Sequence, residues 1–540
     1  MLQNMREGVR SPWVLIPIGL IVLSFVLTGA ETLTFGGTQS GVATVNGEEI
    51  SESELQMAIE GQRRQLTDVY GDQIDPGPVA GTPVYNESGE LVSYDPANFI
   101  LGFGKVNGRR VIVGGEDFTM RGGSPSPAGL RKSVYAEDLA VQYKIPLIRL
   151  HEGSGGSVGG TGGKGPSLPG PVNAPSRFRS VAQAMATVPV ATAAMGAVAG
   201  LPAGRLVASH FSVMSKSTAQ IITAGPAVVE RAMGEKKTKD ELGGWKVHTK
   251  NGTVDNGADD EVACLEEIKR FLSFMPDNIN QLAPLVESDD PVDRCEELLL
   301  EVVPRDRRIA FEMRKIINAV FDADSFFEMG RGYGRSQITG LARLNGQTVG
   351  VWGNDCKFLA GSMTRDGAHK ARRFMELCEA FTLPIVTLVD EPGFMIGSQA
   401  EREATIRHGA SAVLTAAMTT VPWAAVMVRR SFGVAQAAHY GPEAYVLAWP
   451  SAESGPLPVE GGVAVAFRRE IESAADPDTK RRELEELLAS KQSPFPRAEA
   501  LAVHDLIDPR ETRPELCKWL ARVQPLLPDL LGPSAFAIRP

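Results

Sequence analysis

An internal repeat constrains the fold of this chain more than any other feature of its sequence. In the first half KVNGRRVIVGGEDF leads through MRGGS to KIPLIRL, and in the second RLNGQTVGVWGNDC leads through LAGS to TLPIVTL. Matching positions keep an offset of 238 residues, as between Asn107 and Asn345, and later an offset of 233, as between Gly200 and Gly433. A register held over so many positions predicts two homologous domains.

Each half shows the same order of predicted elements. A hairpin forms around the Asn-Gly dipeptide, then a helix and a short apolar strand follow, and a second apolar strand ends at a glycine. This alternation is typical of parallel βαβ units, whose sites lie at the carboxyl ends of the strands. The predicted fold class is therefore α/β. The predicted helices span 133–142 and 371–380, and the predicted strands span 145–150, 188–200, 384–389 and 421–433.

Composition excludes several functions. The 540 residues include 55 Lys and Arg against 65 Asp and Glu, a net charge of −10, which argues against a general nucleic-acid binder. The five cysteines lie far apart without CxxC spacing, so neither a zinc ribbon nor a disulfide framework is expected. We predict no bound metal.

The N-terminus differs in character from the rest of the chain. Residues 11–30 carry no charge, and residues 13–28 (WVLIPIGLIVLSFVLT) are almost wholly apolar, which is long enough for a membrane-spanning helix. Arg6 and Arg10 precede the run and favour a cytoplasmic N-terminus. We predict an uncleaved membrane anchor over residues 1–35. A cleaved signal peptide and a buried core helix are the alternatives.

The segment after the predicted anchor reads GVATVNGEEISESELQMAIEGQRRQL. It predicts a strand at 42–45, a turn at Asn46-Gly47 and a helix opened by a capping box at Ser51 and Glu54. Residues 1–76 resemble the start of membrane-anchored periplasmic peptidyl-prolyl isomerases of the SurA/PpiD type, with residues 36–76 a partial copy. No parvulin-type catalytic domain follows, so we expect no isomerase activity.

Glycine-rich loops follow the predicted strands of both halves. They are HEGSGGSVGGTGGKG (151–165), AVAGLPAG (197–204), DEPGFMIGSQAE (390–401) and RRSFGVAQA (429–437). The GTGGKG segment lacks the Ser or Thr that a phosphate-binding Walker loop needs after its lysine. Because both halves place glycine after the same strand, we predict backbone N–H pairs that form oxyanion holes.

Four stretches carry a family resemblance: YDPANFILGFGKVNGRRVIVGGEDFTMRGGS, AGPAVVERAMGE, FEMRKIINAVFDADSFFEMGRGYG and LPIVTLVDEPGFMIGSQAEREATIRHGA. Residues 79–530 resemble the carboxyltransferase (beta) subunit of biotin-dependent acyl-CoA carboxylases, the propionyl-CoA and methylcrotonyl-CoA carboxylase group. The resemblance implies two tandem crotonase-like (ClpP/crotonase) domains. We expect residues 77–305 to form the acyl-CoA side and residues 306–540 the biotin side.

The resemblance also implies site residues. The CAGGGAY segment of the family aligns with residues 198–204, so Gly200 and Leu201 would donate N–H groups to the thioester oxygen. Its KAYGGAYD segment aligns with residues 430–437, so Val434 and Ala435 would bind the ureido oxygen of biotin. Such chemistry needs no side-chain general base. The other expected contacts are Gly155, Gly156, Gly393, Phe394 and Ala437 with substrate, and Phe432 and Gly433 with the cofactor.

This chain departs from the family pattern in three ways. Leu201 and Pro202 replace glycines, and Pro202 has no N–H to donate. Val434 also replaces a glycine and adds bulk beside the biotin position. Ala437 stands where family members often carry an acidic residue associated with acyl-chain choice. A different acyl group or reduced activity is therefore expected.

The resemblance implies a carboxyltransferase that moves a carboxyl group from carboxybiotin to the alpha (or vinylogous) carbon of a small acyl-CoA, through enolates held in two oxyanion holes. No biotinyl AMKM segment occurs, so biotin would arrive on a biotin carboxylase or biotin carboxyl carrier partner. A homo-oligomer, a hexamer by resemblance, is expected. A membrane-bound biotin-dependent decarboxylase subunit and an inactive membrane-tethered scaffold or folding helper are the alternatives. The enzyme body is expected in the cytoplasm and the N-terminal segment in the inner membrane, two expectations that conflict.

Overall fold

The computed structural model describes residues 41–45, 48–51, 75–76, 81–155 and 178–536. The chain divides into two compact units, residues 1–74 and 75–540. In the first unit, β1 (Gly41–Val45) pairs antiparallel with β2 (Glu48–Ser51), which confirms the strand predicted at 42–45. The predicted anchor and the helix predicted after Ser51 lie outside the described residues. In the part of the chain that is described, no helix is long and apolar enough to cross a membrane.

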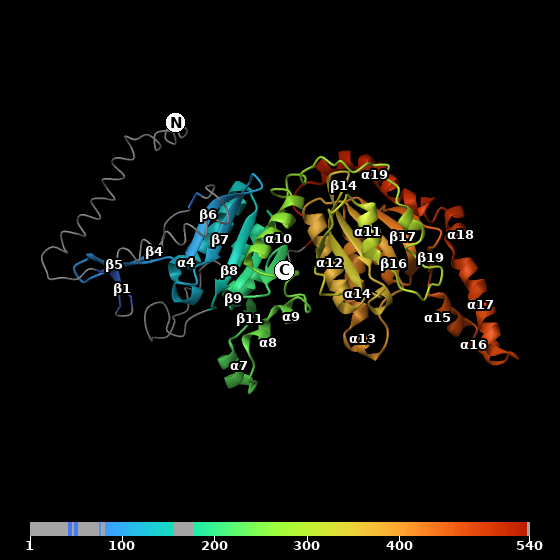
Figure 1. Ribbon diagram of the computed structural model, residues 1–540, viewed down its shortest axis with the longest axis horizontal. Helices are drawn as coiled ribbons and strands as arrows, with labels where there is room; N and C mark the ends of the chain where they lie inside the picture. Colours follow the sequence, from blue (N-terminus) through green and yellow to red (C-terminus); the bar gives the residue numbers. More distant parts are fainter. Residues whose placement is uncertain (1–40, 46–47, 52–74, 77–80, 156–177, 537–540) are drawn as a thin grey trace. The chain divides into compact units, whose positions relative to one another are not determined.

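The second unit has an α/β fold with two β-sheets of eight strands each, and each sheet contains both parallel and antiparallel strand pairs (Figure 1). The first sheet has the order β12-β10-β9-β8-β7-β6-β3, with β11 paired to β9, and the second has the order β13-β14-β15-β16-β17-β18-β20, with β19 paired to β17. A separate hairpin joins β4 (Gly81–Tyr85) and β5 (Leu91–Pro96). The first sheet comprises β3 (Asp75–Pro76), β6 (Phe99–Val106), β7 (Arg109–Glu116), β8 (Leu147–Gly153), β9 (Val190–Ala199), β10 (Phe211–Ser215), β11 (Gln220–Ile222) and β12 (Asn256–Ala258). The second comprises β13 (Phe327–Met329), β14 (Gln337–Leu344), β15 (Gln347–Asn354), β16 (Ile385–Glu391), β17 (Trp423–Phe432), β18 (Tyr445–Ala448), β19 (Glu453–Gly455) and β20 (Asp505–Leu506).

Strand pairing reproduces the sequence repeat. Ile112 pairs with Leu147 in the first sheet, and Gly350 pairs with Ile385 in the second, each 238 residues later. The register between β8 and β9 shifts after His151, and the register between β16 and β17 shifts after Val389, the matching position. The duplication therefore extends to the irregularities of the backbone.

Both predicted Asn-Gly hairpins are present. Asn107 and Gly108 join β6 to β7 with φ of 50° and 79°, and Asn345 and Gly346 join β14 to β15 with φ of 49° and 76°. Two consecutive residues with positive φ are typical of the type I′ turn, which favours Asn followed by Gly. The strands beyond each hairpin pair in parallel, as predicted.

The two predicted helices are present but begin earlier than the apolar pattern suggested. The helix predicted at 133–142 is α4 (Pro127–Tyr143), and the helix predicted at 371–380 is α12 (Arg365–Ala380). Ser126 and Thr364 cap these helices by accepting from the N–H of Gly129 and Gly367. The first turns were missed because small and polar residues there carry no apolar period. The strand predicted at 145–150 likewise extends to Gly153 and that at 384–389 to Glu391.

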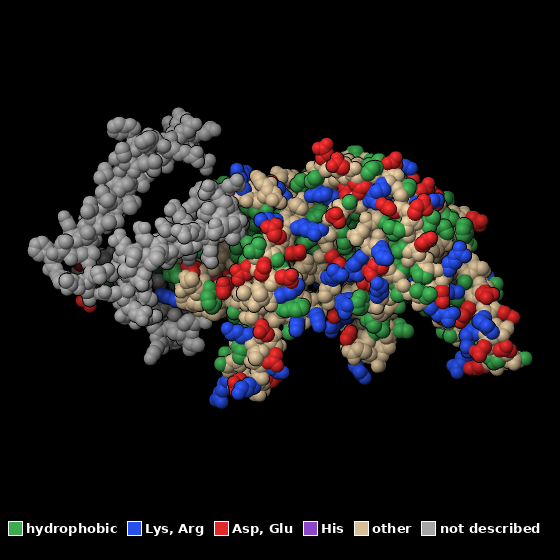
Figure 2. Space-filling model, viewed as in Figure 1, with side chains coloured by type: hydrophobic (Ala, Val, Ile, Leu, Met, Phe, Trp, Pro, Cys, Tyr) green, Lys and Arg blue, Asp and Glu red, His purple; other side chains and the backbone are tan. Residues whose placement is uncertain are grey.

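Helices cover the sheets, and a large buried apolar cluster in the second half includes Ile338, Val351 and Trp449. Charged groups also join the halves, since Arg373 of α12 pairs with buried Asp255 next to β12. On the face shown in Figure 2, basic and acidic side chains are interspersed over both halves. The remaining helices are η2 (Arg121–Gly123), α5 (Arg179–Met185), α6 (Leu201–Val207), α7 (Pro226–Met233), α8 (Lys239–Gly243), α9 (Trp245–His248), α10 (Glu261–Phe274), η3 (Glu297–Leu300), α11 (Met313–Val320), η4 (Leu359–Gly361), α13 (Ser398–Arg402), α14 (Thr405–Met418), η5 (Ala435–His439), α15 (Val459–Ala466), α16 (Arg468–Glu472), α17 (Pro477–Gln492), α18 (Pro494–Glu499), η6 (Pro509–Glu511), α19 (Thr512–Val523) and η7 (Gln524–Leu530).

Candidate active site

The carboxyl end of β9 carries the first group of predicted site residues. Gly200 is exposed, has φ of 63° and precedes α6, which begins at Leu201. A side chain there would meet the backbone of the neighbouring loop, because a Cβ on Gly200 would lie 2.6 Å from the Cα of Gly155. Glycine is therefore required by both the backbone conformation and the close approach. The structure brings Gly155 and Gly200 together, whereas Gly156 lies outside the described residues.

The carboxyl end of β17 repeats this arrangement with more space. Gly433 has φ of 64° and directly precedes Val434 and Ala435, where η5 begins. The atom nearest a Cβ built on Gly433 is the Pro456 carbonyl oxygen at 3.7 Å. Val434 is 64% exposed, and Ala435 is buried.

The turn after β16 lies beside the Gly433 turn. Gly393, the repeat equivalent of Gly155, has φ of 127°, and the atom nearest its added Cβ would be the Phe432 carbonyl oxygen at 4.0 Å. Phe394 packs its ring against Gly409 of α14. The side chain of Phe432 is fully buried, so only its backbone could contact a ligand. Ala437 is exposed, and its N–H donates to the carbonyl oxygen of Val434 (3.1 Å).

The repeat register shows an asymmetry between the two predicted donor pairs. Leu201 is equivalent to Val434, and Pro202 is equivalent to Ala435, both at the offset of 233. Ala435 therefore has a backbone N–H in the second half, whereas its equivalent in the first half, Pro202, has none. The donors predicted in the first half, Gly200 and Leu201, lie one residue earlier than the pair predicted in the second.

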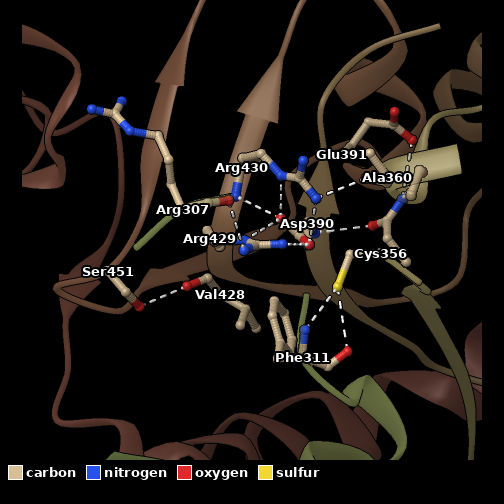
Figure 3. Close-up of polar contacts among 12 residues, drawn as sticks. Arg307, Phe311, Cys356, Ala360, Asp390, Glu391, Val428, Arg429, Arg430 and Ser451 are labelled. Atoms are coloured by element: carbon tan, nitrogen blue, oxygen red, sulfur yellow. Dashed lines mark hydrogen bonds and ion pairs between the residues drawn. The ribbon is translucent and has the colours of Figure 1, made fainter. Parts of the chain in front are cut away.

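A buried ion cluster lies near the carboxyl ends of β16 and β17 (Figure 3). The carboxylate of Asp390 accepts from Arg429 Nη2 at 2.8 Å and from Arg430 Nε at 2.8 Å. It also accepts from the backbone N–H of Arg430 at 3.1 Å. Arg430 also donates to the carbonyl oxygen of Ala360 (2.7 Å), which ties β17 to η4. Burial alone would raise the pKa of Asp390, but the hydrogen bonds and charges of Arg430 and Arg429 outweigh it and hold that pKa below its ordinary value. Asp390 is therefore a buried carboxylate with two cationic partners.

Among the residues that the structure describes, the matching acid in the first half pairs with no arginine or lysine. Glu152 is equivalent to Asp390, while Gly196 and Ala197 stand where the second half has Arg429 and Arg430. The carboxylate of Glu152 lies against the Cα of Gly196, in space that a side chain at residue 196 would fill. Burial, followed by the charge of Glu261, raises the pKa of Glu152.

Two buried carboxylate–histidine pairs were not predicted. In the first half, His151 Nδ1 lies 3.0 Å from Glu116 Oε2, and in the second, His439 Nε2 lies 3.3 Å from Glu391 Oε2. Burial works to raise the pKa of Glu116, but the charge and hydrogen bond of His151 outweigh it and lower that pKa. The available signal was the presence of ionisable residues inside apolar strands, as in LIRLHE and TLVDE.

Within the described ranges, no group of three or more His, Cys, Asp or Glu residues is placed to hold a metal ion. His408 lies with its Nδ1 2.6 Å from Nε2 of His369.

Known proteins resemble this chain in sequence and in fold. Residues 95–523 match the carboxyl transferase domain family, and residues 1–82 match the SurA-like N-terminal domain family. The carboxyltransferase subunit of propionyl-CoA carboxylase from Haloferax mediterranei is 33% identical over 430 residues, which cover 77% of this chain and 81% of that protein. The human mitochondrial propionyl-CoA carboxylase beta chain is 34% identical over 426 residues, covering 77% and 76%.

A solved structure agrees with these relatives. The transcarboxylase 12S hexamer core, solved with methylmalonyl-CoA and methylmalonic acid bound, has a TM-score of 0.77 and 27% identity, and the match covers 91% of this chain and 97% of that one. The duplicated sheets, the paired glycine turns and the match over 95–523 lead to one assignment. The chain belongs to the carboxyl transferase family and is a biotin-dependent acyl-CoA carboxyltransferase of the acyl-CoA carboxylase beta-subunit type.

Proposed function

We propose that the chain carboxylates a small acyl-CoA, with propionyl-CoA as the preferred substrate, and that the two glycine turns hold the two reacting groups. The observation that carries this assignment is the recurrence of a positive-φ glycine at the end of β9 and of β17, each followed by a short helix that begins at Leu201 in the first half and at Ala435 in the second. The first N–H groups of a helix have no intrahelical acceptor, so they are available to an oxyanion. The names of the relatives support propionyl-CoA.

In this proposal the first half stabilises the acyl-CoA enolate. Loss of the α-proton places negative charge on the thioester oxygen, and the N–H groups of Gly200 and Leu201 donate to that oxygen. Each such donor increases the reaction rate by a factor of about 10²–10³ when it is fixed in position. Gly155 supports Gly200 from the neighbouring loop, since their backbones are in contact.

The second half holds biotin, which would come on a partner subunit and supplies the carboxyl group when bound. The turn fits a ureido ring because side-chain positions at Gly393 and Gly433 are open, with no atom closer than 3.7 Å to an added Cβ. Val434 and Ala435 donate to the ureido oxygen, while the exposed Val434 side chain narrows the entrance. Ala437 lies one turn further along η5, where its small size leaves room for the acyl chain.

The same backbone donors stabilise the enolate in either direction of the reaction. The partner subunit, and not these turns, therefore decides between carboxylation and decarboxylation.

We propose a homo-oligomer in which the first half of one copy faces the second half of another, because the related 12S core is a hexamer. We place the enzyme body in the cytoplasm, where CoA thioesters occur, and we propose residues 1–74 as a separate N-terminal unit.

The deciding experiment is carboxyl transfer from carboxybiotin to acetyl-, propionyl- and methylcrotonyl-CoA by the purified full chain. We expect transfer to propionyl-CoA to exceed transfer to methylcrotonyl-CoA. Binding of each CoA ester is measured in parallel by calorimetry. If no ester is carboxylated and none binds, the proposed function is wrong.

A further inference from the structure

The buried carboxylate of Glu391 connects four segments of the second half. Its Oε1 accepts from the N–H of Gly393 at 2.9 Å and of Met363 at 3.3 Å. Its Oε2 accepts from Asn354 Nδ2 at 3.1 Å and lies 3.3 Å from His439 Nε2. These partners belong to the turn after β16, the segment after η4, the end of β15 and the end of η5. One side chain thus joins the backbone elements that surround the second glycine turn.

His439 transmits this contact to the turn that carries the predicted donors. It is the last residue of η5, which begins at Ala435, and it is fully buried. Its ring stacks on Trp352 with centroids 4.0 Å apart, and its carbonyl oxygen accepts from Thr387 Oγ1 (2.8 Å). The contact with Glu391 is thus one of three that hold the end of η5, beside the Trp352 ring and the Thr387 hydroxyl.

The first half lacks this connection. The residue equivalent to Glu391 is Gly153, and the residue equivalent to His439 is Leu206, which packs in an apolar cluster. The carboxylate–histidine pair of the first half joins β7 to β8 and includes no residue of α6. The Glu391 contact is therefore specific to the half with the more open turn, where no atom lies closer than 3.7 Å to a Cβ added at Gly393 or Gly433.

We propose that Glu391 is a positioning residue that, through Gly393 and His439, fixes the biotin-side turn of the second half. A fully buried carboxylate is costly unless its hydrogen-bonding capacity is used. All the partners of Glu391 lie on the segments that shape this turn, which explains its place at the end of β16. The proposal rests on the proposed assignment of Val434 and Ala435.

The test compares Glu391→Ala, Glu391→Gln and a matched control, Glu379→Ala. Glu379 is another buried carboxylate of the second half, and it accepts from the backbone N–H groups of Thr420 and Val421. These two residues precede the amino end of β17, whereas the Gly433 turn follows its carboxyl end. Consumption of methylmalonyl-CoA is measured as a function of free biotin. For Glu391→Ala we expect a rise of about tenfold in the KM for biotin, one tenfold step being about 1.4 kcal/mol, with the KM for methylmalonyl-CoA unchanged.

Glu391→Gln keeps an oxygen that accepts from Gly393, so we expect it to restore most of the affinity for biotin. Glu379→Ala should lower the melting temperature and leave the ratio of the two KM values unchanged. Equal changes of both KM values in Glu391→Ala, or the same KM ratio in Glu391→Ala and Glu379→Ala, would overturn the proposal.

Amide hydrogen exchange tests positioning without activity. Glu391→Ala should exchange faster than the unaltered chain over 393–397 and 433–439, with no change over 200–207. Unchanged exchange over 433–439 would contradict the positioning role. If the unaltered chain consumes no methylmalonyl-CoA in the presence of biotin, the proposed function fails, and the exchange result alone then decides the role of Glu391.

Discussion

The two halves share one backbone plan but differ in what supports their glycine turns. In the first half, the Gly155 and Gly200 backbones touch, and the neighbouring acid Glu152 pairs with no arginine in the described part of the chain. In the second, Gly393 and Gly433 have open space, and hydrogen bonds of the buried Asp390 and Glu391 side chains connect the loops. A duplicated fold thus keeps the position of its N–H donors by close packing in one copy and by buried polar contacts in the other.

The largest difference in stability between the two halves is expected from substitutions of the equivalent acids, Asp390 and Glu152. Asp390→Asn leaves Arg429 and Arg430 buried without their counter-charge, so we expect a loss of about 3–5 kcal/mol in the free energy of unfolding. Because the folded pKa of Asp390 lies below its ordinary 3.8, the ionised side chain stabilises the fold above that pH. This stabilisation disappears as the pH falls through the folded pKa.

The matched first-half variant is Glu152→Gln. The pKa of Glu152 is raised above its ordinary 4.5, so its contribution to stability is present below that pH and is lost as the pH rises through the folded pKa. We therefore expect Glu152→Gln to keep or increase stability at neutral pH. Urea unfolding of both variants between acid and neutral pH measures the contrast, and similar losses in the two would refute it.

The glycine turns should respond next most strongly. Gly200→Ala combines a positive φ with a contact of 2.6 Å to Gly155, so the turn must move, and we expect carboxyl transfer to fall by about 100-fold. Gly433→Ala has the same positive φ but free space, so a cost of about 1–2 kcal/mol in stability is expected. Transfer rates and urea unfolding measure both, and an equal loss of rate in the two variants would show that the close approach is unimportant.

A smaller change in rate is expected when the equivalent residues Pro202 and Ala435 are exchanged for one another. Pro202→Ala introduces an N–H at the position equivalent to Ala435, and we expect up to about a tenfold increase in the rate of acyl-CoA deprotonation. The reciprocal change, Ala435→Pro, removes that N–H and should slow carboxyl transfer to biotin. Exchange of the α-proton of propionyl-CoA with solvent reports the first, and biotin-dependent consumption of methylmalonyl-CoA reports the second. A rate decrease in Pro202→Ala would mean that the proline ring contributes more than the missing donor.

The smallest effect is expected from deleting residues 1–74. They form a compact unit apart from residues 75–540, which include the β3 strand that pairs with β6. We expect the dissociation constant for propionyl-CoA to stay within about twofold, as measured by calorimetry. Loss of binding on deletion would show that the N-terminal unit contributes to the first-half site.

Several parts of this molecule were predictable from local rules. The Asn-Gly hairpins, the parallel strands after them and the glycine at the end of β9 and β17 follow from turn chemistry and from the repeat. The starts of α4 and α12 were less predictable because Ser126 and Thr364 act as caps outside the apolar pattern. The structural description does not include the predicted anchor, which remains a prediction.

The sequence by itself determined the duplication, the register of its two copies and the glycine turns, because these depend on neighbours in the chain and on backbone conformations that few residues adopt. Only the tertiary structure decided which charges meet. Arg429 and Asp390 lie 39 residues apart, and His439 and Glu391 lie 48 apart. A buried charge is stable only where a distant segment supplies its partner, and that pairing exists only once the sheet has formed.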